Sequence, residues 1–183
     1  MKPAVAITIA ALLLVIVIAL PSAHPQIPSG REVVSPSAYV SLEPVARGGN
    51  FQLAVVLKIR PGFHINARKP SAEYLIPTDL RPTLPAGFKS AGEIAYPPGE
   101  LKTFAFSKTP LNVYADRVIL RLPLFAQPNA PLGAQHIPLK LHYQACNNEV
   151  CLPPVTLDVD AQLTVAATAA NSRPAHPELF PAH

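Results

Sequence analysis

The chain has 183 residues and a formal net charge of +4, with 23 prolines and no tryptophan. Its basic residues are scattered rather than clustered, which argues against nucleic-acid binding. Abundant proline favours short strands and ordered turns over long helices, and the lack of tryptophan excludes the tryptophan-centred core of antibody domains. The length suits a single folded domain.

The N-terminus is an apolar run over residues 4–20, which is followed by the stretch PSAHPQIPSG. This layout is typical of a secretory signal. An uncleaved membrane anchor stays open as the alternative, because Pro21 stands where a small residue is wanted if cleavage follows Ala23, and the run is at the short limit of a membrane span. We expect residues 1–23 to be a signal peptide or membrane anchor, residues 24–37 to be a linker, and the mature protein to lie outside the cytoplasm.

From Ala38 the hydrophobic pattern has a period of two, which indicates half-buried β-strands. The stretch FQLAVVLKI, residues 51–59, is the clearest case, and residues 118–124 and 155–163 alternate in the same way. About seven such strands, with no amphipathic helix long enough to cross over a parallel sheet, predict an all-β antiparallel β-sandwich. Residues 166–183 are rich in alanine and proline without periodicity, which predicts a disordered tail.

The stretch YQACNNEVCLPP contains both cysteines of the chain, Cys146 and Cys151, with two prolines after them. In an exported protein, two cysteines across the mouth of a hairpin ordinarily form a structural disulfide. The loop that this bond would close is short, so chain-entropy models give it a stabilisation on the order of 2 kcal/mol. A domain of this size can fold around its hydrophobic core without a disulfide of this kind.

A second interpretation is a disulfide that opens and closes. Bonds in such tight loops are often strained and reachable at the surface, and both properties favour thiol exchange. Pro153 and Pro154 have no backbone N–H, so they stop the hairpin ladder beside Cys151. The unpaired edge that results is a place where a partner protein can dock.

A third interpretation takes the two cysteines as soft metal ligands together with His142, which shares a strand face with Cys146, or with His64 or His136. Two thiolates and one imidazole can hold Cu(I) or zinc. Against this, the spacing of the cysteines is looser than in usual zinc sites, and the chain has no second cysteine pair. Spacing alone leaves the structural, redox and metal interpretations open.

The sequence segments around the cysteines resemble those of a known family. The stretch YQACNNEVCLPP is similar to the active-site hairpin of the N-terminal domain of the thiol:disulfide interchange protein DsbD. The upstream stretch GFHINARKPSAEYLIPTDL, residues 62–80, looks like the segment in the corresponding place, and NVYADRVILRLPL fits the strand that follows it. The similarity extends over residues 37–165.

The resemblance implies an immunoglobulin-like periplasmic domain over residues 38–165, whose cysteine pair passes electrons without a cofactor. In the family, a thioredoxin-like domain served by a membrane-embedded one reduces this domain, which then reduces exported disulfide-containing proteins. Cys151 corresponds to the cysteine that forms mixed disulfides with partners, and Cys146 to the one that resolves them. The printed sequence shows no membrane helices after Leu20 and no thioredoxin-like end, so we expect the domain to be served in trans.

The family also implies neighbours for the cysteine pair. A cap loop with an aromatic residue shields the pair, and Phe104 or Phe106 in the connection LKTFAF would be that residue. His64 and Asn66 stand where some members have tyrosines that approach the pair, while Tyr143 and His142 lie just before it.

Two ionisable side chains near the pair in the sequence can affect the thiolate. His142 would favour the thiolate if it lies close, and Glu149 would disfavour it.

The rival functions are a non-catalytic exported binding module with a structural disulfide, and a Cys/His copper-binding protein.

Overall fold

A computed structural model describes residues 28–181 of the chain. The expected signal peptide or anchor, residues 1–23, lies outside the described residues. No helix between residues 28 and 181 has the length and apolar character needed to span a membrane.

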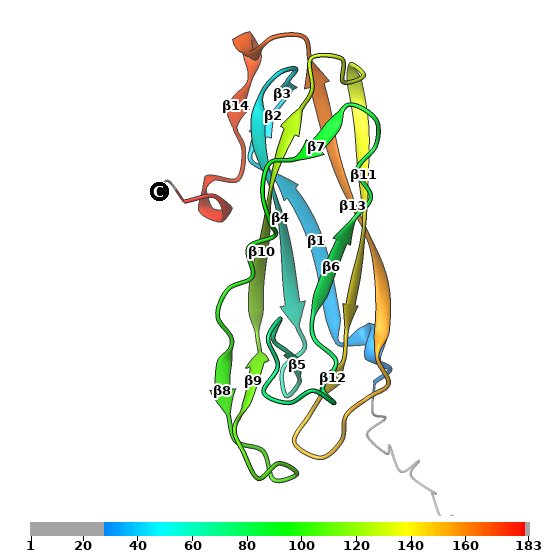
Figure 1. The fold of residues 1–183 in the computed structure, drawn as a ribbon, viewed down its shortest axis with the longest axis vertical. Helices are drawn as coiled ribbons and strands as arrows, with labels where there is room; N and C mark the ends of the chain where they lie inside the picture. Colours follow the sequence, from blue (N-terminus) through cyan, green and yellow to red (C-terminus); the bar gives the residue numbers. More distant parts are fainter. Residues whose placement is uncertain (1–27, 182–183) are drawn as a thin grey trace, which may run out of the picture.

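Two long sheets pack face to face and form the body of the molecule (Figure 1). Each contains four strands, and all pairings are antiparallel except that of β3 with β13. The first sheet has the order β1 (Val34–Val40), β4 (Asn50–Ile59), β10 (Arg117–Ala126) and β7 (Phe88–Ser90). The second has the order β3 (Val45–Ala46), β13 (Val155–Ala166), β11 (Gly133–Tyr143) and β6 (Asp79–Pro82).

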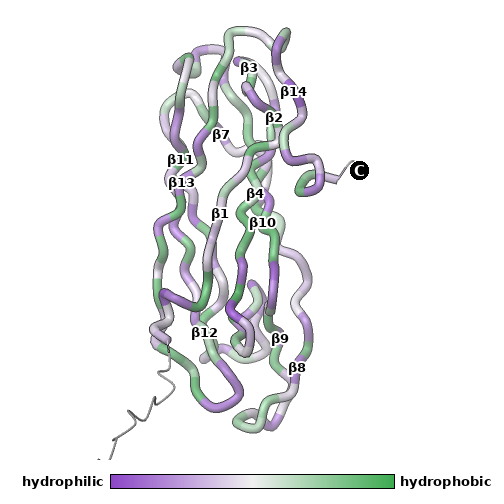
Figure 2. Tube along the Cα trace, turned by 180° about the vertical axis from the view of Figure 1, so that it is seen from behind, coloured by the Kyte–Doolittle hydropathy of each residue, from purple (hydrophilic) through white to green (hydrophobic). Residues whose placement is uncertain are grey.

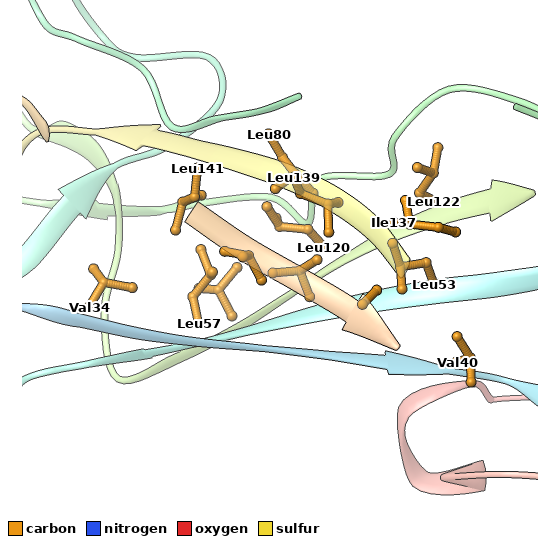
Figure 3. Packing of buried hydrophobic residues seen from close by; sticks show 14 of the residues in the cluster. Val34, Val40, Leu53, Leu57, Leu80, Leu120, Leu122, Ile137, Leu139 and Leu141 are labelled. Carbon is orange, nitrogen blue, oxygen red and sulfur yellow. The ribbon is translucent and has the colours of Figure 1, made fainter. Parts of the chain in front are cut away.

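The predicted period of two is visible in the burial of these strands. Every second residue of β10 is buried, from Val118 to Ala126, and the same holds for β11 from Ile137 to Tyr143. Hydrophilic and hydrophobic positions accordingly alternate along β11 and β13 (Figure 2). The inward side chains of both sheets meet in one core, where Leu53 and Leu57 of β4 lie among leucines of β10 and β11 (Figure 3). The predicted all-β sandwich is confirmed.

A third sheet closes one end of the sandwich, with the order β12 (Ala145–Cys146), β5 (His64–Asn66), β9 (Leu111–Tyr114) and β8 (Glu100–Lys102) (Figure 1). We call it the end sheet. One of its faces belongs to the main core through Ile65, Tyr114 and Ala145. Its other face carries Leu111 and Val113, which form a separate small cluster with Leu75 and Phe104. We call this second face the cap face.

The ordered structure begins earlier than the sequence predicted. The segment expected to be linker, residues 24–37, already contains a 3-10 turn, η1 (Gly30–Glu32), and the start of β1 at Val34. The hydroxyl of Tyr143 donates a hydrogen bond of 2.7 Å to the buried carbonyl of Gly30. This contact and the 2.7 Å hydrogen bond from Arg31 Nη1 to the Thr156 carbonyl hold η1 against the sandwich, and such contacts leave no periodic signal in the sequence.

The prediction that residues 166–183 form a disordered tail was also wrong for the part of this segment that the structure describes. It contains η2 (Ala169–Asn171), β14 (Arg173–Pro174), which pairs with β2 (Leu42–Glu43), and η3 (Pro177–Leu179). Leu179 is buried against Ala54 and Val56, which point outward from β4. The tail is held because it covers an apolar outer face, and Arg121 Nε also donates to the Leu179 carbonyl at 2.7 Å.

The sandwich core should carry most of the stability. Leu120 has no exposed surface, so Leu120→Ala should lower the free energy of unfolding by about 2–5 kcal/mol through lost burial and a residual cavity. The matched control is Leu132→Ala, because Leu132 is 51% exposed and its loss should change stability by about 0.5 kcal/mol or less. Urea unfolding of the two variants checks this, and equal losses would contradict the assignment of the core.

Candidate redox site

The cysteines lie on either side of a tight turn after β12. Asn147 builds this turn, because its side-chain Oδ1 accepts hydrogen bonds of 2.8 Å from the N–H groups of both Glu149 and Val150. Asparagine suits such turns since its short side chain can bond to the backbone two residues on. The turn brings Cys151 back beside Cys146.

Cys146 and Cys151 face each other as a non-hydrogen-bonded antiparallel pair and are joined by a disulfide. The hydrogen bonds lie on either side of them, from Asn147 N to Val150 O at 3.0 Å and from Leu152 N to Ala145 O at 2.8 Å. Side chains are closest at this kind of position, which accounts for a Cα–Cα separation of only 4.0 Å. The register therefore places the two sulfurs within bonding distance.

The two cysteines differ sharply in exposure. Cys146 is only 1% exposed, because β5 lies on one side of it and Cys151 on the other. Cys151 is exposed, and no described strand pairs with it on its outer side. Cys151 is therefore the residue that a molecule in solution can reach.

His64 lies directly opposite Cys146 in the pairing of β5 with β12. Directly opposed residues point to the same face, so both side chains lie on the cap face of the end sheet. His64 is 4% exposed, and its Nε2 has no hydrogen-bond partner in the structure. Burial, aided by the nearby positive charge of Lys102, lowers the pKa of His64 to about 4. The imidazole is therefore neutral at pH 7.

Phe104 covers the His64 ring. The two rings are stacked with their centroids 4.0 Å apart and an interplanar angle of 20°. Phe104 is 8% exposed, whereas Phe106 is 44% exposed and stacks on the far side, with its centroid 5.4 Å from that of Phe104. Of the two aromatic residues that the sequence offered as a cap, Phe104 is the one in contact with a direct neighbour of Cys146. Shielding of the disulfide itself stays a prediction.

Asn66 and Tyr143, two other residues that the family implied, have structural partners. Asn66 Nδ2 donates to the carbonyl of Ile76 at 3.0 Å, and the Asn66 carbonyl accepts from the Thr78 hydroxyl at 2.6 Å. Tyr143 is fully buried in the main core, where burial raises its pKa to about 12. Asn66 therefore holds the loop after β5, and Tyr143 anchors the end of β11.

The histidines proposed as metal ligands are dispersed. His142 Nδ1 lies 3.0 Å from the Thr156 hydroxyl on β13, and His136 Nδ1 lies 2.7 Å from Asp160 Oδ2. Over residues 28–181, no three histidine, cysteine, aspartate or glutamate side chains come together in an arrangement that could hold a metal ion. His142 bonds to the neighbouring strand of its own sheet and is not drawn toward the cysteines.

Two residues of the cap face were not recognised in the sequence. Leu75 packs against Phe104 from the loop after β5, and Lys102 acts on His64 from β8. Neither residue lies in a recognisable motif, and the spacing of each from the cysteines gives no sign that it is close to them in the fold. The register of β8 on β9 brings Lys102 to the cap face, and the course of the loop after β5 brings Leu75 onto Phe104.

A β-sandwich that carries an asymmetrically exposed disulfide in a hairpin at one end defines a class of small disulfide-bearing β-domains. Within that class, residues 31–163 match the family described as "Thiol:disulfide interchange protein DsbD, N-terminal". The chain belongs to this family, and the resemblance of its two sequence motifs is confirmed.

Among solved structures, the chain is similar to the N-terminal periplasmic domain of ScsB from Proteus mirabilis. It is 16% identical in sequence and superposes with a TM-score of 0.44. The match covers 74% of this chain and 49% of that one, so the chain spans about half the length of this neighbour. No curated protein matches the sequence.

Removal of the Phe104 ring should expose the disulfide. We expect Phe104→Ala to speed reduction of the Cys146–Cys151 bond by a small thiol several-fold, because the rate of exchange depends on access to the sulfur. Phe106→Ala is the matched control and should have a smaller effect, since Phe106 does not touch His64 in the described contacts. The rate of thiol appearance in excess dithiothreitol measures both. If neither variant is faster than the unaltered protein, the cap hypothesis is wrong.

His64 should also make the fold sensitive to acid. Its pKa is about 4 in the folded protein against an ordinary value of 6.5, so the unfolded chain takes up the proton first as the pH falls. The free energy of unfolding should therefore decrease between about pH 6.5 and pH 4, by on the order of 3 kcal/mol from this group. Urea unfolding of His64→Gln should show a decrease that is smaller by this amount. An unchanged pH dependence in the variant would contradict the buried, neutral state of His64.

Proposed function

We propose that this domain carries out thiol–disulfide exchange outside the cytoplasm, with Cys151 as the partner-facing sulfur and Cys146 as the resolving one. The observation that supports this most directly is the difference in exposure, with Cys151 at an open edge and Cys146 buried behind it. A disulfide that served only to hold the hairpin would not need one reachable cysteine. Membership of the DsbD N-terminal family supports the same chemistry.

The exchange needs no cofactor, because the two sulfurs carry the electrons themselves. A thiolate of the reducing partner attacks Cys151 Sγ, a bond forms between the two sulfurs, and the Cys146–Cys151 bond breaks with its electron pair on Cys146. A second thiolate of the partner then displaces Cys151. The partner is oxidised to a disulfide, and the domain holds two thiols that can reduce an exported acceptor by the same steps in reverse.

The end of the molecule that carries Cys151 suits transient docking of another protein (Figure 1). Five large apolar side chains are notably exposed in the described part of the chain. Four of them lie at this end: in the end sheet, in the connection LKTFAF, in the turn between the cysteines, and in the loop that packs on Phe104. These four are Tyr74, Leu101, Phe106 and Val150. Exposed apolar groups gathered in one region favour an interaction site.

We take the partners from the family. The proposed electron donor is a thioredoxin-like protein served by a membrane-embedded reductase, and the acceptors are exported proteins with disulfides. The apolar N-terminal segment supports a periplasmic location, either free after cleavage or anchored by that segment. The family match supports the same compartment.

Single-cysteine variants test the roles of the two sulfurs. Cys146→Ala should accumulate mixed disulfides with a thioredoxin-like protein in cells, because Cys151 can form the adduct and the domain no longer has a second sulfur to resolve it. The matched control, Cys151→Ala, should trap far less, since its remaining sulfur is buried. Non-reducing electrophoresis and mass spectrometry of the adducts measure the difference.

Two outcomes would count against the proposal. Equal trapping by the two variants would overturn the assignment of roles. No trapping by either, with the protein folded and exported, together with a reduction potential below about −300 mV, would favour a structural disulfide in a non-catalytic binding module.

A further inference from the structure

His64 has an unusual environment for a histidine. Its Nε2 is buried and has no hydrogen-bond partner, although most buried polar atoms in proteins have one. The other three histidines between residues 28 and 181 each have a polar or aromatic neighbour away from the cysteines: His136 contacts Asp160, His142 contacts Thr156, and His176 packs edge-on against Tyr39. His64, directly opposite Cys146, therefore carries a buried, unpaired nitrogen that calls for a role.

Cys146 has a matching requirement. Once a mixed disulfide has formed on Cys151, Cys146 is a thiol in a place that water scarcely reaches, since the residue is only 1% exposed. Only the thiolate attacks a disulfide, and burial disfavours a charged sulfur. Resolution of the adduct thus needs a base within reach of Cys146. Cβ atoms of directly opposed residues in antiparallel strands lie about 4.5–5.5 Å apart, a span that an imidazole bridges.

We propose that His64 is the base that takes the proton from Cys146 when this thiol resolves a mixed disulfide on Cys151, and that the Phe104 ring controls when it can do so. The inference rests on the thiol–disulfide exchange proposed above. It assigns to His64 a proton-accepting role in the resolving half of that reaction.

In the resolving step, the Cys146 thiol gives its proton to the free imidazole nitrogen of His64, and the resulting thiolate attacks Cys151 Sγ. The Cys146–Cys151 bond forms, and the bond from Cys151 to the partner sulfur breaks. The partner sulfur leaves with the electron pair as a thiolate, and the proton on His64 passes to it or to solvent.

The neighbours of His64 show how its basicity is held down while the cap is closed. Phe104 keeps water from one face of the ring, and Lys102 on β8 adds a positive charge that opposes protonation. Glu100 offsets part of that charge, with its Oε2 3.0 Å from Lys102 Nζ. The cap-face residues of β9, Leu111 and Val113, carry no charge, and β12 contributes only Cys146. When Phe104 moves away, water can solvate the imidazolium, and His64 becomes a better base.

The experiment follows the reduced protein with an aromatic disulfide reagent that releases a coloured thiolate. The first release reports the attack by Cys151, and the second reports resolution of the adduct by Cys146. We expect His64→Gln to slow the second release by about 100-fold at pH 7, as is typical when a general base is lost, and to leave the first unchanged. The difference should shrink as the pH rises beyond the ordinary pKa of a thiol, about 8.5, and vanish at the higher pH where the buried Cys146 loses its proton without help.

Control variants separate a proton-accepting role from a structural one. His136→Gln removes an imidazole from the exposed side of β11 and should leave both releases unchanged. His64→Phe keeps an aromatic ring for Phe104 to stack on and should behave like His64→Gln. A loss in the His64 variants that is equal for both releases, or that persists at high pH, would overturn the proposal.

Two further results complete the test. In Phe104→Ala, the pKa of His64 measured by NMR should rise from about 4 toward 6.5, and an unchanged value would overturn the control by Phe104. A normal second release at every pH in both His64 variants would refute the inference and leave the exchange function standing. If the folded, unaltered protein gives no second release at any pH, the exchange function itself fails.

Discussion

The site depends on Cys146 having two different neighbours in one register. On one side it faces Cys151 at a non-hydrogen-bonded position, and on the other it faces His64. Because side chains alternate between the faces of a strand, a slip of one residue would turn Cys146 toward the main core and Ala145 toward the cap face. The burial of Ala145 in the core and the turn built by Asn147 prevent that slip. The pairing of the sulfurs and their contact with the cap face are therefore set together.

The end sheet separates a large hydrophobic core from a small one. Its inner face shares the main core of the sandwich, while its cap face is covered only by the cluster of Leu75, Phe104, Leu111 and Val113. The free energy needed to open an apolar contact grows with the area exposed, and local openings need only a fraction of the stability of the whole fold. We therefore expect this cluster to be able to open without loss of the sandwich, so that Cys146 becomes accessible while its register stays in place.

The sequence predicted the sandwich well because long, half-buried strands leave a strong period-two pattern, as in β10 and β11. It also located the cysteine hairpin, because both cysteines lie in one short motif. The partners of the pair were harder to predict, since β5 has three residues and β12 only two, too few for periodicity to reveal their register. The sequence left the choice between Phe104 and Phe106 open, because both lie in a connection outside any strand, where no periodicity shows which ring turns inward.

The arrangement of the hairpin does not rest on the disulfide alone. Just before it, the Tyr143 hydroxyl fixes the end of β11 to Gly30, and just after it, Leu152 is buried in the main core and donates from its N–H to the carbonyl of Ala145. Asn147 holds the turn between them through side-chain bonds to the backbone. A bond across so short a loop adds only about 2 kcal/mol by chain entropy, so these contacts keep their places when it opens. In the exchange proposed above, the two thiols would then stay side by side, and this proximity would make closure of the disulfide by Cys146 fast compared with attack by a second molecule.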